Sequence, residues 1–141
     1  MIIVDTNVLS EPMRPSPDPR VMRWLHDQDP AGLFTTATVI AELSAGIARM
    51  PAGARRDAVA RAIDEVVTEE LAGRVLPFDL EAAIEFGALS AARESSGHAL
   101  SMADGQIAAV CLTNGAALAT RNTRDFEELG IDLIDPWAVT S

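Results

Sequence analysis

The chain has 141 residues, 48% of them apolar, and this size suits one globular domain that buries roughly two-thirds of its unfolded surface. Acidic residues outnumber basic ones by 21 to 11, giving a net charge of −10, but the apolar content is too high for an acidic disordered tail. All 11 basic residues are Arg, and the absence of Lys excludes Walker-type phosphate loops, Schiff-base enzymes and Ser-Lys nucleophiles. The single Cys111 excludes an internal disulfide.

Short apolar runs predict five strands, each bounded by residues that start a helix or a turn. The first strand ends at Asp5, and its unbroken apolar pattern is typical of a parallel strand buried on both faces. In chain order, the strands are expected over residues 1–4, 33–36, 75–78, 116–120 and 131–134.

Helical periodicity fills the segments between these strands. A short helix is expected from Asn7, and a proline-rich loop then leads to a helix capped by Asp18. The long helix over residues 54–71 is expected to have an apolar face of Ala58, Ala62 and Val66. The other helices are expected over residues 37–50, 79–92 and 101–114, with a short one from 123.

Strands that alternate with helices predict a single α/β domain over residues 1–141. Its sheet is expected to be mostly parallel, with about five strands and helices on both faces. Ligands of such open sheets bind at the carboxyl ends of the strands. Neither a signal peptide nor a membrane-spanning segment is recognised, so we expect a soluble, cytoplasmic protein.

Two acidic residues stand where a charge is costly. Asp5 directly follows a buried strand, although a role as N-cap of the next helix explains its position equally well. Asp104 shares the inward stripe of its helix with Ile107 and Cys111, although Ser101-x-x-Asp104 also fits a capping box.

Two further acids are expected to reach the same edge of the sheet. Glu42 lies near Gly46, where glycine costs about 1 kcal/mol relative to Ala and suggests a close approach, yet Glu42 alone fits a solvated acid. Asp125 follows the strand over residues 116–120. Four converging carboxylates repel one another without a cation, and oxygen ligands alone select Mg²⁺ or Mn²⁺ over Zn²⁺. The chemistry suggested is hydrolysis of a phosphate ester.

Four motifs in this order resemble those of PIN-domain ribonucleases. They are Ile3-Val4-Asp5-Thr6-Asn7-Val8, Ala41-Glu42-Leu43, Ala103-Asp104, and Thr120-Arg121-Asn122 leading to Asp125-Phe126. Their order and spacing are similar to those of bacterial VapC toxins. Three further segments are similar to the FitB-like branch: Ser10-Glu11-Pro12, Leu76-Pro77-Phe78-Asp79 and Pro136-Trp137.

This resemblance implies an Mg²⁺- or Mn²⁺-dependent endoribonuclease, the toxin of a type II toxin–antitoxin module. It implies that Asp5 and Asp104 are metal ligands and that Glu42 and Asp125 complete the site. Members of the FitB-like branch can carry an acid where this chain has Asn122, so the fourth ligand stays open. The residues expected to orient water or phosphate by hydrogen bonding are Thr6, Thr120 and Asn122.

The resemblance also implies a homodimer and a VapB-like antitoxin. The antitoxin's C-terminal segment is expected to lie along the acidic groove and present Arg to it, while its other end binds operator DNA. Arg121 and Arg124 are the candidates for guiding the RNA backbone, and a rim of Arg14, Arg20 and Arg23 is considered beside them. Pairing of these side chains with nearby acids explains them equally well.

Two other functions stay open. One is a non-catalytic PIN-fold interaction module in an antitoxin–DNA complex. The other is a different Mg²⁺-dependent, phosphoryl-handling α/β domain, such as a phosphatase or a receiver domain, whose usual Lys is missing here.

Overall fold

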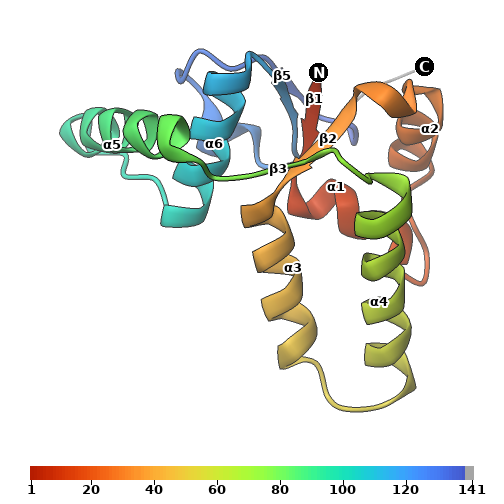
Figure 1. Cartoon of the computed structure of the whole chain (residues 1–141). Helices are drawn as coiled ribbons and strands as arrows, with labels where there is room; N and C mark the ends of the chain where they lie inside the picture. The colour runs from red at the N-terminus through yellow and green to blue at the C-terminus, as the bar shows by residue number, and fades with distance from the viewer. Residues whose placement is uncertain (139–141) are drawn as a thin grey trace.

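A parallel sheet lies at the centre of the computed structural model, which describes residues 1–138 (Figure 1). The strands are β1 (Ile2–Val4), β2 (Leu33–Thr36), β3 (Val75–Leu76), β4 (Ala117–Ala119) and β5 (Leu133–Ile134). They are ordered β3-β2-β1-β4-β5, and all four pairings are parallel. The predicted α/β class and five-stranded parallel sheet are therefore confirmed.

The helices begin where the capping residues predict. Their bounds are α1 (Thr6–Ser10), α2 (Pro19–Asp27), α3 (Ala37–Arg49), α4 (Ala54–Glu65), α5 (Leu80–Ser95) and α6 (Met102–Asn114). Short 3-10 turns occupy η1 (Glu11–Met13), η2 (Pro30–Gly32) and η4 (Thr123–Phe126), and η3 (Val66–Glu70) is a π-helix. Asp18 and Asp79 each accept a hydrogen bond from a backbone N–H of the first turn that follows them. Within residues 1–138, no helix is long and apolar enough to cross a membrane.

Side chains of the central strands alternate between two apolar layers. Ile3 and Leu118, which pair in register, pack in the core formed with α3, α5 and α6. Their neighbours Val4 and Ala119 face the opposite layer, which contains residues of α1 and α2 together with Trp137. The carboxyl ends of β1 and β4 are thus fixed side by side, because both faces of the sheet are packed.

The predicted helix over residues 54–71 differs from the observed structure in two ways. The α-helix ends at Glu65, and the chain continues as the π-helix η3. Its expected apolar face is also not buried, since Ala58 is exposed and Ala62 is half-buried, whereas Ile63 enters the core. The reason is that α3 and α4 extend together away from the sheet (Figure 1), so the stripe lines a cavity instead of the core.

Three predicted strands are clearly shorter than expected, and the one over residues 131–134 pairs only through Leu133 and Ile134. The run over residues 75–78 pairs with β2 only through Val75 and Leu76. Pro77 has no N–H to donate, so the ladder ends before it. In the run over residues 116–120, Ala116 instead donates its N–H to the carbonyl of Cys111 and closes α6. At its other end this strand stops at Ala119, so Thr120 lies just beyond β4.

Candidate active site

The two central strands end beside each other at the point where the direction of strand addition reverses. β2 and β3 lie on one side of β1, and β4 and β5 lie on the other. Val4 and Ala119 are partners in the ladder, so Asp5 and Thr120 leave the sheet at the same level. The N–H of Asp5 donates to the carbonyl of Ala119 at 2.9 Å. Open α/β sheets place ligands at such a reversal point.

The Asp5 carboxylate is buried and oriented by two hydrogen bonds. Asp5 as a whole is only 4% exposed. Oδ1 accepts from the N–H of Thr6 at 2.7 Å, and Oδ2 accepts from the hydroxyl of Thr120 at 2.8 Å. The Thr120 oxygen in turn accepts from the N–H of Asn122 at 3.1 Å. Asp5 is also the N-cap of α1, so both explanations offered by the sequence apply to the same side chain.

Glu42 is tied to this site from α3. Thr6 donates its hydroxyl to Oε1 of Glu42 at 2.9 Å, which joins α1 to α3 across 36 positions of the chain. Glu42 itself is exposed. A hollow of about 460 Å³ between α3 and α6 includes Glu42 and Ala103, so open space adjoins Glu42. Glu42 is therefore a solvated acid that is held toward the carboxyl edge of the sheet.

Asp104 lies in the first turn of α6, where the Ser101 hydroxyl oxygen accepts from its N–H at 3.1 Å. Burial raises the pKa of Asp104 above its ordinary value, and the charges of Asp5, Asp125 and Glu42 raise it further. A hydrogen bond with Ser101 acts in the opposite direction on this pKa. The four predicted acids thus share one electrostatic environment.

Gly105 was not singled out from the sequence, yet it determines how closely α6 packs beside Asp104. A Cβ at this position would lie 2.7 Å from Cε2 of Phe86 on α5. Glycine therefore allows the two helices to approach, and the signal in the sequence is a glycine within the first turns of a strongly apolar helix.

The segment after β4 contains the remaining predicted site residues. Their side chains form fewer hydrogen bonds than those of Asp5 and Thr120. Asp125 is exposed in η4 and acts on Asp104 through its charge. Asn122 contributes its backbone N–H, while Arg124 forms no side-chain hydrogen bond or ion pair within residues 1–138. Arg121 lies over the ring of Trp137, with Cζ 5.1 Å from the ring centroid.

The proposed arginine rim is largely paired with neighbouring acids. Arg14 lies 3.3 Å from the buried Glu11, and Arg20 lies 2.8 Å from Asp18. Hydrogen bonds from Arg20, helped by the charge of Arg121, lower the pKa of Asp18 to about 2. For Arg14 and Arg20 the explanation as local ion pairs is therefore the one that the structure supports.

The donor set of the four acids fits a hard divalent cation. All four contribute carboxylate oxygens, which Mg²⁺ and Mn²⁺ prefer, and the oxygens of Asp5 retain lone pairs beyond their two hydrogen bonds. Within residues 1–138, however, no group of three or more His, Cys, Asp or Glu side chains is close enough to hold a metal ion without some movement. The four acids therefore interact electrostatically, but their side chains are not arranged as a complete set of metal ligands.

Replacing Asp104 by Asn is expected to stabilise the fold when chelator keeps divalent metal away. Because its pKa is raised in the native state, the ionised form of Asp104 opposes folding, and this effect grows as pH rises through that pKa. The melting temperature of Asp104→Asn at pH 7 with EDTA should exceed that of the wild type, and the difference should shrink toward pH 4. Asp64→Asn, on an exposed position of α4, is the control and should change little. A lower melting temperature for Asp104→Asn than for the wild type would contradict the conclusion that ionised Asp104 opposes folding.

Comparison with known proteins agrees with the motifs. The PIN domain profile matches residues 2–132. The chain is 44% identical to the VapC ribonuclease Y4jK of Sinorhizobium fredii, over 97% of this chain and 98% of that protein. It is 33% identical to the toxin FitB of Neisseria gonorrhoeae, over 97% of this chain and 99% of FitB. A solved structure of FitAB bound to an IR36 DNA fragment superposes with a TM-score of 0.92, at 31% identity, covering 100% of this chain and 99% of that one. This chain therefore belongs to the PIN-domain family, among relatives that include the VapC and FitB toxins, as its motifs predicted.

Proposed function

We propose that this protein is a metal-dependent endoribonuclease and the toxin of a type II toxin–antitoxin pair. The observation that carries the proposal is the buried, doubly hydrogen-bonded carboxylate of Asp5, whose charge acts on Asp104 together with the charges of Glu42 and Asp125. Such a concentration of like charge opposes folding and is typical of functional sites. The relative named a VapC ribonuclease, 44% identical, supports the nuclease class.

In this proposal the four acids hold Mg²⁺ or Mn²⁺, which would supply a water of lowered pKa and neutralise phosphate charge. Thr120 keeps one oxygen of Asp5 in place, and Thr6 holds Glu42 toward the same edge. Arg121 follows β4 in the chain and its guanidinium lies over the Trp137 ring; in this proposal it contacts a phosphate of the RNA. Arg124 and Asn122 lie beside it as further contacts for the substrate.

Asp5→Asn should abolish RNA cleavage while the fold survives. The amide can still accept from Thr6 and can donate to the hydroxyl oxygen of Thr120, but the negative charge is lost. Cleavage of total cellular RNA in Mn²⁺ should fall by more than the roughly 10- to 100-fold typical of losing an outer partner of a metal ligand. Calorimetric titration with Mn²⁺ separates this enzyme from a non-catalytic PIN-fold module, which needs no metal. Cleavage by Asp5→Asn at the wild-type rate would refute the proposal.

Thr120→Val is expected to weaken Mn²⁺ binding by about 10- to 100-fold, because the variant no longer orients Asp5. Thr35→Val is a matched control. Thr35 is equally buried, but its hydroxyl donates to the carbonyl of Val4 at 2.9 Å and not to an acid. Thr35→Val removes one buried hydrogen bond, whereas Thr120→Val removes the bond to Asp5 and the bond from the N–H of Asn122, so Thr120→Val should lose at least as much stability as the control. Equal losses of Mn²⁺ affinity in the two variants would show that Thr120 has no specific role at the site.

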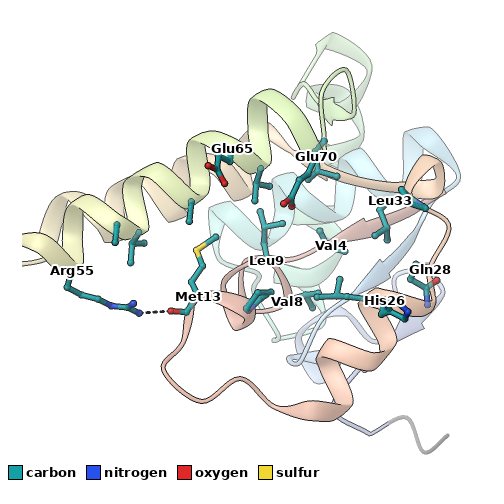
Figure 2. A pocket seen from close by; sticks show the side chains of 18 residues that line it. Val4, Val8, Leu9, Met13, His26, Gln28, Leu33, Arg55, Glu65 and Glu70 are labelled. Atoms are coloured by element: carbon teal, nitrogen blue, oxygen red, sulfur yellow. Dashed lines mark hydrogen bonds between the residues drawn. The ribbon is translucent and has the colours of Figure 1, made fainter.

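An apolar cavity of about 670 Å³ supports a protein partner as the second part of the proposal. It lies between α4 with η3 on one side and α1, α2 and β2 on the other (Figure 2). Leu9 and Met13 line one wall, and Ala62 and Val66 line the other. Apolar surface of this extent on a folded protein is typical of an interaction site.

The charges around this cavity favour an antitoxin segment that is apolar and basic. Glu65 and Glu70 border it as exposed acids, whereas Arg55, which also lines it, donates to the carbonyl of Met13 (Figure 2). The chain as a whole carries −10, so a basic partner is attracted at long range. The FitAB relative was solved as a complex on DNA, which supports operator binding through the antitoxin. We therefore propose a VapB-like antitoxin as the occupant.

Ala62→Arg should abolish neutralisation by the antitoxin without reducing RNA cleavage. The new side chain would occupy the cavity, whereas Ala60→Arg would point from an exposed position outside it. Each variant would be co-expressed with the small protein encoded immediately upstream, and growth and co-purification would be measured. Only the Ala62→Arg toxin should stay active and unbound. Unchanged co-purification of Ala62→Arg would place the antitoxin elsewhere.

The homodimer expected from the resemblance stays a prediction. The most exposed large apolar side chains within residues 1–138 are Leu80 at 77%, Ile84 at 69% and Met102 at 69%. They lie in the first turns of α5 and α6, away from the cavity that we assign to the antitoxin. A second copy that covered them would leave that cavity free.

A further inference from the structure

Arg93, in the last turn of α5, joins two segments that are distant in the chain. Its Nε donates to the carbonyl of His98 at 2.8 Å, Nη1 donates to the carbonyl of Glu127 at 3.1 Å, and Nη2 donates to the carbonyl of Asp125 at 3.3 Å. Each nitrogen of the guanidinium thus contacts a backbone oxygen. Within residues 1–138 the side chain forms no ion pair, so its role is to hold backbone and not to neutralise an acid.

The segment that Arg93 holds has few internal constraints. η4 begins at Thr123, and the side chain of the preceding Asn122 forms no capping hydrogen bond. Just after it, Glu128 has a φ of 65°, a left-handed conformation that costs a non-glycine residue roughly 1–2 kcal/mol. Phe126 is buried and anchors the middle of the segment, while Asp125 beside it is exposed. The N–H of Asp125 donates to the carbonyl of Asn122 at 3.1 Å within the segment, whereas the carbonyl of Asp125 is held from outside, by Arg93.

A local explanation accounts for only part of this arrangement. A basic residue in the last turn of a helix interacts favourably with the helix dipole and can bond nearby carbonyls, and the contact with His98, five positions away, fits that role. The contacts with Asp125 and Glu127 span 32 and 34 positions and do not cap α5. Lys could not reproduce them, because its single nitrogen lacks the planar fork of Arg.

We infer that Arg93 is a positioning residue for Asp125. It holds the carbonyls of Asp125 and Glu127 in place and ties that segment to the loop that leads into α6. The inference rests on the proposed function, in which Asp125 completes the metal site. It also distinguishes Asp125 from Asn122 as the fourth ligand, since Arg93 supports Asp125 directly.

A double-mutant cycle on Mn²⁺ affinity tests this inference. Calorimetry would compare Arg93→Ala in the wild type and in Asp125→Asn. Arg93→Ala should weaken Mn²⁺ binding by about 10-fold in the wild type, a loss typical of an outer partner of a ligand, and should have no further effect once Asp125 is Asn. Arg93→Lys, which retains one donor, should show the same pattern and serves if Arg93→Ala does not fold.

Arg74→Ala is the matched control. Arg74 is also half-buried and donates to backbone carbonyls, those of Leu33 and Glu70, but it lies beside β2 and β3, away from the acids. It should lower the melting temperature without changing Mn²⁺ affinity.

Two results would overturn the role of Arg93 while leaving the proposed function intact. One is wild-type Mn²⁺ affinity in both Arg93 variants. The other is an equal loss of affinity with and without the Asp125 carboxylate, which would mean that Arg93 acts by another route. A wild-type protein that binds no Mn²⁺ would instead refute the proposed function, and this inference with it.

Discussion

The hydrogen bond from the Thr120 hydroxyl to the Asp5 carboxylate is the contact on which the rest of the site depends. It places a nearly buried negative charge at the end of β1, where an unpaired ion would cost several kcal/mol. The contact exists because β1 and β4 are adjacent and parallel, with Val4 opposite Ala119. Strand order, packing of both sheet faces and orientation of the carboxylate are therefore parts of one constraint.

The protein accumulates like charge at this edge, and the accumulation has a thermodynamic cost. Four of its 21 acidic residues influence one another there, and the raised pKa of Asp104 expresses the repulsion among them together with burial. Nearby arginines do not relieve it: Arg14 and Arg20 pair with other acids, and Arg93 is committed to backbone carbonyls. Function at the expense of stability is a common feature of active sites. In the proposed function, the excess of acids over bases serves both a local cation site and a long-range attraction for a basic partner.

The apolar cavity beside α4 has a different origin. A helix that extends from the sheet cannot bury its whole apolar face against the core, and the π-helix η3 returns the chain toward β3 before that face is covered. The surface left open is large and apolar, and Glu65, Glu70 and Arg55 are the charged residues that border it. None of the four acids lines it, so the partner surface that we propose is distinct from the acidic groove, where the resemblance implies that an Arg of the antitoxin is presented.

The sequence by itself determined the features that depend on neighbours along the chain. Capping by Asp18, Asp79 and Ser101 and the alternation of short strands with helices were predictable because a cap or a helical stripe involves residues within a few positions of each other. Asp5 and Asp104 were recognisable because a charge next to an apolar run is locally anomalous.

Only the tertiary structure decided which distant groups meet. Thr120 reaches Asp5 across 115 positions, and Arg93 reaches Asp125 across 32. The same is true of the open face of α4 and of the close approach at Gly105, since burial and clearance depend on the neighbouring element and not on the residue's own segment. Periodicity tells which face of a helix is apolar, but only packing decides whether that face meets the core, a cavity or a partner.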